Sequence, residues 1–318
     1  MKHYLFALAA WAMALLASCS GEEELIYHSS LADNVVRVTA NVNDIGTRAS
    51  YTNSTLAEFG ISIQNAKNEK YCYGNNKVTK AASVWTPATQ MLWENKDQEV
   101  NIYAYAPYNS SYTGNIYAAT AFPVSVSTDQ TSATDQSDFL FCKASGFKPS
   151  EDLQNGNVPI VFNHALCQLK INITFSGNEF NTSSAVNPIK TVYVTGTKVN
   201  AVCNFVAQSI TAAKTVSSVT AQKMNFTAAA ENSAAKATYS CILIPQTIAA
   251  NGFQIIIQTD NNKVYTWTST QAVTLEQGKC HQLDLAVGKD KVSVVDVTVK
   301  DWEASSTTIS GQCSAVEY

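Results

Sequence analysis

The sequence predicts an all-β protein made of two tandem antiparallel β-sandwich domains. Apolar residues recur at every second position along most of the chain, and no segment has the apolar period of a long amphipathic helix. Thr, Ser, Asn, Val and Tyr are also abundant, as is usual in extended strands. A period of two gives each strand one buried and one solvated face, which suits antiparallel sheets.

The first 18 residues have the pattern of an export signal. Lys2 and His3 precede an apolar run over 4–16, which is too short to cross a bilayer but fits the central region of a signal peptide. Small residues then lead to Cys19, which resembles the lipobox of bacterial lipoproteins, where the cysteine sulfur carries a diacylglycerol. Two acyl chains give stable anchoring. A signal peptide followed by an unrelated cysteine is the alternative.

The segment 20–24 is acidic and resembles the surface-export signal of Bacteroidales lipoproteins, although a solvated spacer has the same composition. Without the signal, 318 − 18 = 300 residues remain, a length that favours two domains. Only 14% of residues are charged and the net charge is −4. This composition lacks the basic surface that nucleic acid requires, so we expect no nucleic-acid partner.

Strands are expected in order along the first half. Val36, Val38, Ala40 and Val42 alternate with polar residues, and similar alternation covers 59–63, 100–106 and, most clearly, 165–175. The segment 176–188 is rich in Gly, Asn and Ser and is the expected joint between domains. We therefore expect a leader over 19–48, an N-terminal sandwich over 49–182 and a C-terminal sandwich over 183–318.

The second half repeats this pattern. Strands are expected over 239–243 and 283–287, and a hairpin over 253–268 turns at 260–262. In the segment 292–299 the apolar phase shifts between Val294 and Val295, which predicts a β-bulge.

Residues that carry chemistry are few. The mature chain has His28, His164 and His281, and the motifs of metalloproteases, serine hydrolases and nucleotide-binding loops do not occur. We expect no enzyme, no metal and no cofactor. Seven cysteines follow Cys19, and because most lie in apolar strand positions we expect buried free thiols. Aromatic residues crowd the first half, and an exposed row that includes Trp85 and Trp93 would suit a carbohydrate-binding protein.

Several segments together resemble the fimbrillin family of the Bacteroidales, the FimA-like and Mfa-like pilins that build type V pili. The lipobox is the first, and the others follow in the order of that family across nearly the whole chain: 45–50 (IGTRAS), 100–108 (VNIYAYAPY), 137–141 (SDFLF), 162–171 (FNHALCQLKI), 278–285 (GKCHQLDL) and 297–302.

The resemblance implies two transthyretin-like sandwiches and a fimbrial function at the cell surface. Such pilins are anchored in the outer membrane through the lipidated cysteine, here Cys19, until a protease cuts after an arginine, here between Arg48 and Ala49. The leader strand with Val36, Val38, Ala40 and Val42 is then replaced by a strand of a neighbouring subunit through β-augmentation. Arg37 is a poorer cleavage site because it lies within the alternating strand.

Two C-terminal segments are candidate donor strands. One contains Val292, Val294, Val297 and Val299, and the other is the tail with Ile309 and Val316. The first is expected to be the last core strand, so the tail is the preferred donor. The partners implied are other fimbrial subunits, in a homo- or heteropolymer, and a host or bacterial surface ligand for adhesion. Two alternatives stay open, an uncleaved fimbrial anchor and a carbohydrate-binding surface lipoprotein.

Overall fold

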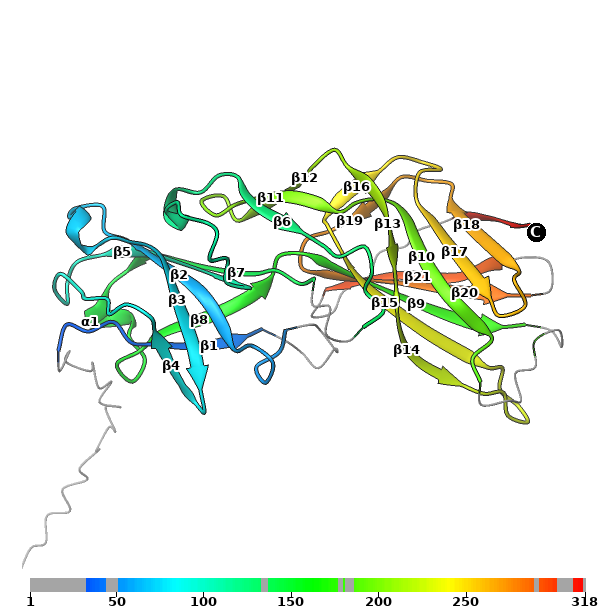
Figure 1. Ribbon diagram of the computed structural model, residues 1–318, viewed down its shortest axis with the longest axis horizontal. Coiled ribbons are helices and arrows are strands. Elements are labelled where there is room, and N and C mark those ends of the chain that lie inside the picture. The colour runs from blue at the N-terminus through cyan, green and yellow to red at the C-terminus, as the bar shows by residue number, and fades with distance from the viewer. Residues whose placement is uncertain are drawn as a thin grey trace, which may run out of the picture.

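The computed structural model confirms the all-β prediction (Figure 1). It describes residues 33–43, 51–132, 137–176, 180, 186–288, 292–301 and 311–316. The helical elements in these ranges are single turns, namely η1 (Glu69–Tyr71), η2 (Ile116–Ala118) and α1 (Pro149–Asp152). No helix in these ranges is long and apolar enough to span a membrane.

The first lobe is a seven-stranded sheet in the order β1-β8-β7-β5-β2-β3-β4. The strands are β1 (Val38–Val42), β2 (Glu58–Gln64), β3 (Tyr73–Ala81), β4 (Val84–Pro87), β5 (Val100–Ala106), β7 (Leu140–Phe147) and β8 (Val158–His164). The sheet curls on itself, because Phe59 of β2 packs against Phe162 of β8 at 5.3 Å although two strands separate them. One apolar core therefore fills the inside of the curl.

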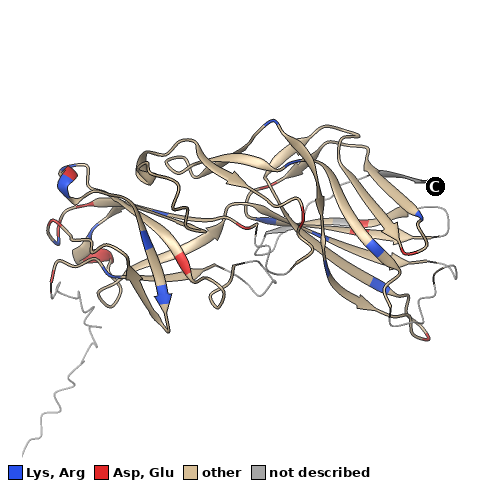
Figure 2. Cartoon of the chain, in the orientation of Figure 1, with Lys and Arg blue, Asp and Glu red and all other residues tan. Residues whose placement is uncertain are grey.

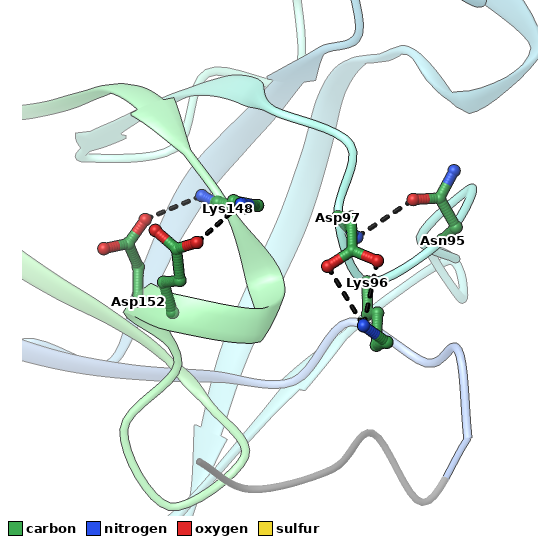
Figure 3. Close-up of polar contacts among 6 residues, drawn as sticks. Asn95, Lys96, Asp97, Lys148 and Asp152 are labelled. Carbon is green, nitrogen blue, oxygen red and sulfur yellow. Dashed lines mark hydrogen bonds and ion pairs between the residues drawn. The ribbon is translucent and has the colours of Figure 1, made fainter. Parts of the chain in front are cut away.

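The helix α1 lies at the outer end of the first lobe (Figure 1), and Figure 3 shows polar contacts around it. The backbone N–H of Lys148 donates to Asp152 Oδ2 at 2.7 Å, and the N–H of Ser150 donates to the carbonyl of Lys96 at 2.8 Å. Lys96 in turn pairs with Asp97 at 2.9 Å. These exposed contacts hold the 95–97 loop against α1.

The second lobe is a sandwich of two five-stranded sheets, β13-β10-β17-β18-β22 and β14-β15-β9-β20-β21. Their strands are β9 (Cys167–Phe175), β10 (Ile189–Lys198), β13 (Val216–Thr220), β14 (Gln222–Thr227), β15 (Lys236–Leu243), β17 (Gln254–Thr259), β18 (Val264–Ser269), β20 (Lys279–Val287), β21 (Val292–Asp301) and β22 (Gly311–Val316). The hydroxyl of Tyr239 on β15 reaches the carbonyl of Ile189 on β10 at 3.4 Å, which joins the two sheets through the core.

Two small sheets complete the fold. The strands β6 (Phe122–Ser125), β11 (Asn200–Asn204) and β12 (Ser209–Ala212) form a three-stranded sheet, and β16 (Gln246–Ile248) pairs with β19 (Val273–Leu275). Because β6 follows β5 of the first lobe but pairs with β11, this sheet ties the two lobes together.

The expected hairpin and bulge are both present. The hairpin is β17–β18, with Asn262 of its turn at φ 64°. In β21, Asp296 pairs with Asp284 and Val294 with Leu285, so Val295 is the extra residue and is 67% exposed. Six cysteines, at positions 72, 142, 167, 203, 241 and 280, are free thiols, and four of them are buried, as expected.

One strand lies in a different lobe from the one we expected. The strand β9, which we expected to end the first sandwich, pairs with β15 and, in parallel, with β20 of the second lobe. The chain passes between lobes at Ala165 and Leu166, both fully buried, and the Gly- and Asn-rich segment connects β9 to β10 within the second lobe. Loop composition marks a reversal of the chain, but it carries no information about the sheet that a strand will join.

An aromatic cluster fills the joint between the lobes. Tyr105 of β5 packs against Phe122 at 4.9 Å and against Phe205 at 5.5 Å, and Phe139 lies 5.9 Å from Phe122. Lys143 of β7 also donates to the carbonyl of Val206 in the second lobe at 2.7 Å. Edge-to-face aromatic packing adds to the burial energy, so this cluster couples the two lobes.

Candidate functional site

The N-terminal strand β1 lies at the edge of the first sheet and completes the core of the lobe. It pairs in parallel with β8, from Val38 opposite Val158 to Val42 opposite Phe162. Val36, Val38, Ala40 and Val42 are 2%, 3%, 8% and 4% exposed and join the same apolar cluster as Phe59. The alternation in the sequence therefore corresponds to one buried face, and the intervening side chains face solvent.

The other side of this segment meets the end of the curled sheet. The N–H of Val36 donates to the carbonyl of Met91 at 2.9 Å, and the N–H of Trp93 donates to the carbonyl of Asn34 at 2.7 Å. Residues 34–42 thus lie between β8 and the chain that follows β4. The segment therefore fills the space between the two ends of the curled sheet.

Polar contacts hold both ends of this segment. At its start, Arg37 forms an exposed ion pair with Asp33 at 2.7 Å, and the hydrogen bond from Arg37 lowers the pKa of Asp33 to about 2. At its end, the N–H of Val42 donates to Asn53 Oδ1 at 2.6 Å, and the N–H of Asn43 donates to the carbonyl of Phe162 at 2.9 Å. Asn53 is a residue that the sequence did not single out, because an Asn in a turn carries no distinguishing signal.

The two candidate donor strands differ in how they are held. β21 forms nine residue pairs with β20, and its Val292 and Val299 are 0% and 6% exposed. Val294 packs partly buried against the core. β22 forms six pairs with β18, from Gly311 opposite Ser269 to Val316 opposite Val264.

Some predicted site residues lie outside the described ranges. These are Cys19, Arg48, Ala49 and Ile309, and the side chains of Val297 and Val316 are also not described. The predictions for them stay predictions.

The two tryptophans of the alternative carbohydrate-binding surface do not lie on the surface. Trp85 is 9% exposed and Trp93 is 2% exposed, and Trp85 packs edge-on against Phe59 at 5.1 Å in the core. Both rings face the inside of the curled sheet. The sequence could not show this, because aromatic residues suit either face of a strand.

Both histidines of the described residues, His164 and His281, are buried. His164 Nδ1 lies 2.7 Å from Asp138 Oδ2, and both side chains are buried. His281 is 1% exposed, and its Nε2 accepts the N–H of Glu276 at 3.0 Å, so that nitrogen carries no proton. Across the described residues, His, Cys, Asp and Glu side chains form no group that could hold a metal ion.

Truncating the buried face of β1 tests how firmly the strand is packed. We expect Val38→Ala to lower the free energy of unfolding by about 2 kcal/mol, because a buried branched side chain leaves a partly unfilled cavity. Thr39→Ala, on the exposed face of the same strand, should change it by less than about 0.5 kcal/mol. Urea unfolding of the full-length chain measures both, and equal effects would contradict the packing described here.

The burial of His281 predicts a pH dependence of stability. Burial lowers the pKa of His281 below its ordinary 6.5, against a smaller opposing effect of the Glu276 carboxylate. Just below pH 6.5 the unfolded chain therefore binds a proton that the folded chain does not, and stability falls as the pH falls. We expect His281→Gln to reduce this fall between pH 6.5 and 5, measured by urea unfolding. An unchanged slope would show that His281 titrates normally.

Comparisons with known proteins agree with this architecture. The model of the family described as fimbrillin-like matches residues 47–302. A candidate cell adhesion protein from Bacteroides uniformis is similar in structure, with a TM-score of 0.62, 19% identity, and coverage of 86% of this chain and 100% of its own. A fimbrial protein from Bacteroides vulgatus has a TM-score of 0.52 and 16% identity, covering 84% of this chain and 99% of its own.

A further similar structure is the tip fimbrial protein Mfa3 from Porphyromonas gingivalis. Its TM-score is 0.51 at 9% identity, and the match covers 84% of this chain and 98% of that one. Among curated proteins, none matches this sequence. At these identities the structural matches establish the fold, and the family match extends over most of the sequence. The chain belongs to the fimbrillin-like family.

Proposed function

We propose that this protein is a structural, non-enzymatic subunit of a cell-surface fimbria that assembles by strand exchange. The observation that carries the proposal is the packing of β1. It is an edge strand with one ladder, to β8, and the residues just before it bond to the chain after β4. Together with Val36, β1 contributes four side chains to the core. The fimbrial and adhesion proteins among the similar structures support the same function.

The sequence before β1 supports export as a lipoprotein. In this proposal Cys19 carries the lipid that holds the precursor in the outer membrane, and a protease cuts between Arg48 and Ala49. The cut separates β1 from the rest of the chain, so the strand stays only while its contacts hold it. Arg37 is a poor alternative, since it lies beside β1 and its carbonyl accepts the N–H of Val158 at 2.8 Å.

Loss of β1 would leave a vacancy that favours a replacement strand. Burial of each of the three valines contributes about 1.5–3 kcal/mol. The backbone of β8, Met91 and Trp93 would also lose its hydrogen-bond partners, and unpaired sheet edges invite pairing with another chain. A neighbour's strand that presents small aliphatic side chains at alternating positions would restore both kinds of contact.

Of the two donor candidates, β22 is the one we propose. Both strands lie at sheet edges, but release of β22 breaks a ladder of six residue pairs, whereas release of β21 breaks nine and exposes Val292 and Val299. Fewer backbone pairs therefore hold β22 in place.

Cleavage can be tested on the surface of producing cells. We expect the mature protein to start at Ala49 and to run as high-mass, SDS-resistant polymers. Arg48→Gln should leave monomers that keep an acylated Cys19, while the matched control Arg37→Gln should polymerise normally. N-terminal sequencing and gel electrophoresis measure these results. A wild-type protein that keeps acylated Cys19 would contradict cleavage and would favour the uncleaved anchor.

Deletion of 311–318 tests the donor strand. We expect the truncated chain to fold with a melting temperature close to that of the full chain, because β22 covers only a sheet edge. We also expect it to form no polymers after cleavage. Val295→Ser, at the exposed bulge of β21, is the control and should polymerise. Normal polymerisation of the truncated chain would assign the donor to another segment.

A further inference from the structure

The connection between β5 and β6 has a composition unlike the rest of the first lobe. This segment, residues 107–121, is here called the tyrosine loop. It contains Tyr108, Tyr112 and Tyr117 among Asn, Ser, Thr and Gly, and it has no charged residue. Connections of this length in compact domains are usually functional, and Tyr, Ser, Asn and Gly are the residues of recognition loops.

Side chains of two neighbouring strands hold the backbone of the tyrosine loop. Asn75 of β3 donates its amide to the carbonyls of Tyr112 at 2.9 Å and Asn109 at 3.3 Å. The hydroxyl of Tyr105 on β5 donates to Asn75 Oδ1 at 2.9 Å and accepts the N–H of Asn109 at 3.2 Å. Ile116 anchors the middle of the loop and is fully buried. The loop therefore has a defined shape before any partner binds.

A glycine allows the loop to lie directly on β3. A Cβ placed on Gly74 would come 2.2 Å from Oδ1 of Asn115 in the loop. A side chain at position 74 would therefore require the Asn115 side chain to move. Gly74 thus lies against the loop near its middle.

The three tyrosine rings are partly exposed and supported from beneath. The ring of Tyr112 lies 4.8 Å from Phe122, and that of Tyr108 lies 6.5 Å from Tyr105. Tyr117 packs against the same core, and burial raises its pKa, so its hydroxyl is neutral at physiological pH. Supported rings offer fixed apolar faces and free hydroxyl groups at little entropic cost.

The surroundings indicate the chemistry of the partner. The loop is tan throughout in Figure 2, because it contains no charged residue. The ammonium of Lys77 on β3 lies 5.5 Å from the centre of the Tyr108 ring, but it is paired with Glu58 at 2.7 Å, so its charge is compensated. None of the exposed large aliphatic side chains of the described chain belongs to the loop itself. A protein interface normally requires large apolar anchors at its centre, whereas a sugar ring needs an aromatic face with neutral amides and hydroxyls around it.

We propose that the tyrosine loop is a binding site for a neutral glycan, with the rings of Tyr108 and Tyr117 as stacking surfaces. Asn75 is a positioning residue, because it holds the loop backbone without presenting its amide to the ligand. The site does not depend on strand exchange, since every contact named above lies within one chain.

Binding is tested with the fluorescently labelled uncleaved chain, which keeps β1, on an array of neutral and sialylated glycans. We expect retention on neutral glycans, and at least tenfold weaker retention for the double variant Tyr108→Ala, Tyr117→Ala. Asn75→Leu should weaken binding although all three tyrosines remain. The matched control is Tyr193→Ala, a partly exposed tyrosine on β10 of the second lobe, which should bind like the wild type.

Thermal unfolding of each variant separates loss of binding from loss of fold. Asn75→Asp, which keeps the acceptor for the Tyr105 hydroxyl but replaces the amide donor with a second oxygen, serves as a second variant. Failure to retain any glycan would overturn the proposal. So would retention of sialylated glycans alone, wild-type binding by the double variant, or capture of a protein from the same cells with no glycan retained.

Discussion

The burial of one aliphatic strand face is the constraint on which the first lobe depends. A seven-stranded sheet that curls on itself brings β8 close to the chain after β4 without joining them directly. β1 occupies that position, and its even-numbered side chains complete the core while its backbone bonds to both sides. The strand is thus essential to the lobe but is held mainly by apolar packing, which any strand of similar shape could supply. That combination makes exchange between subunits physically reasonable.

A second constraint acts at the joint between the lobes. Tyr105 takes part in two structures at once, because its ring packs in the aromatic cluster with Phe122 and Phe205 while its hydroxyl holds Asn75 and the tyrosine loop. Burial raises the pKa of Tyr105 to about 12, so it remains a neutral hydrogen-bond donor. The loop that we propose for glycan recognition is therefore supported by the same residue that couples the lobes.

The buried pair of His164 and Asp138 connects two segments of the first lobe. His164 and Asp138 hold the end of β8 to the chain that enters β7, because the Asp138 carboxylate also accepts the N–H of Phe139 at 2.8 Å. The sequence contained a signal for this pair, since both residues lie in segments shared with the fimbrillins. The two residues are 26 positions apart, so the sequence did not indicate that they are in contact.

Local pattern was sufficient to predict the most regularly alternating strands, the β17–β18 hairpin, the bulge at Val295 and the buried face of β1, because a period of two and turn residues act over a few positions. The partners of β9, the parallel pairing of β1 with β8 and the burial of Trp85 and Trp93 depended on the tertiary structure. Each is set by contacts between residues far apart in the chain, and alternation is the same whichever sheet a strand joins. The sequence by itself therefore determined which side chains of a strand share a face. Only the tertiary structure decided which sheet the strand joins and which residues that face packs against.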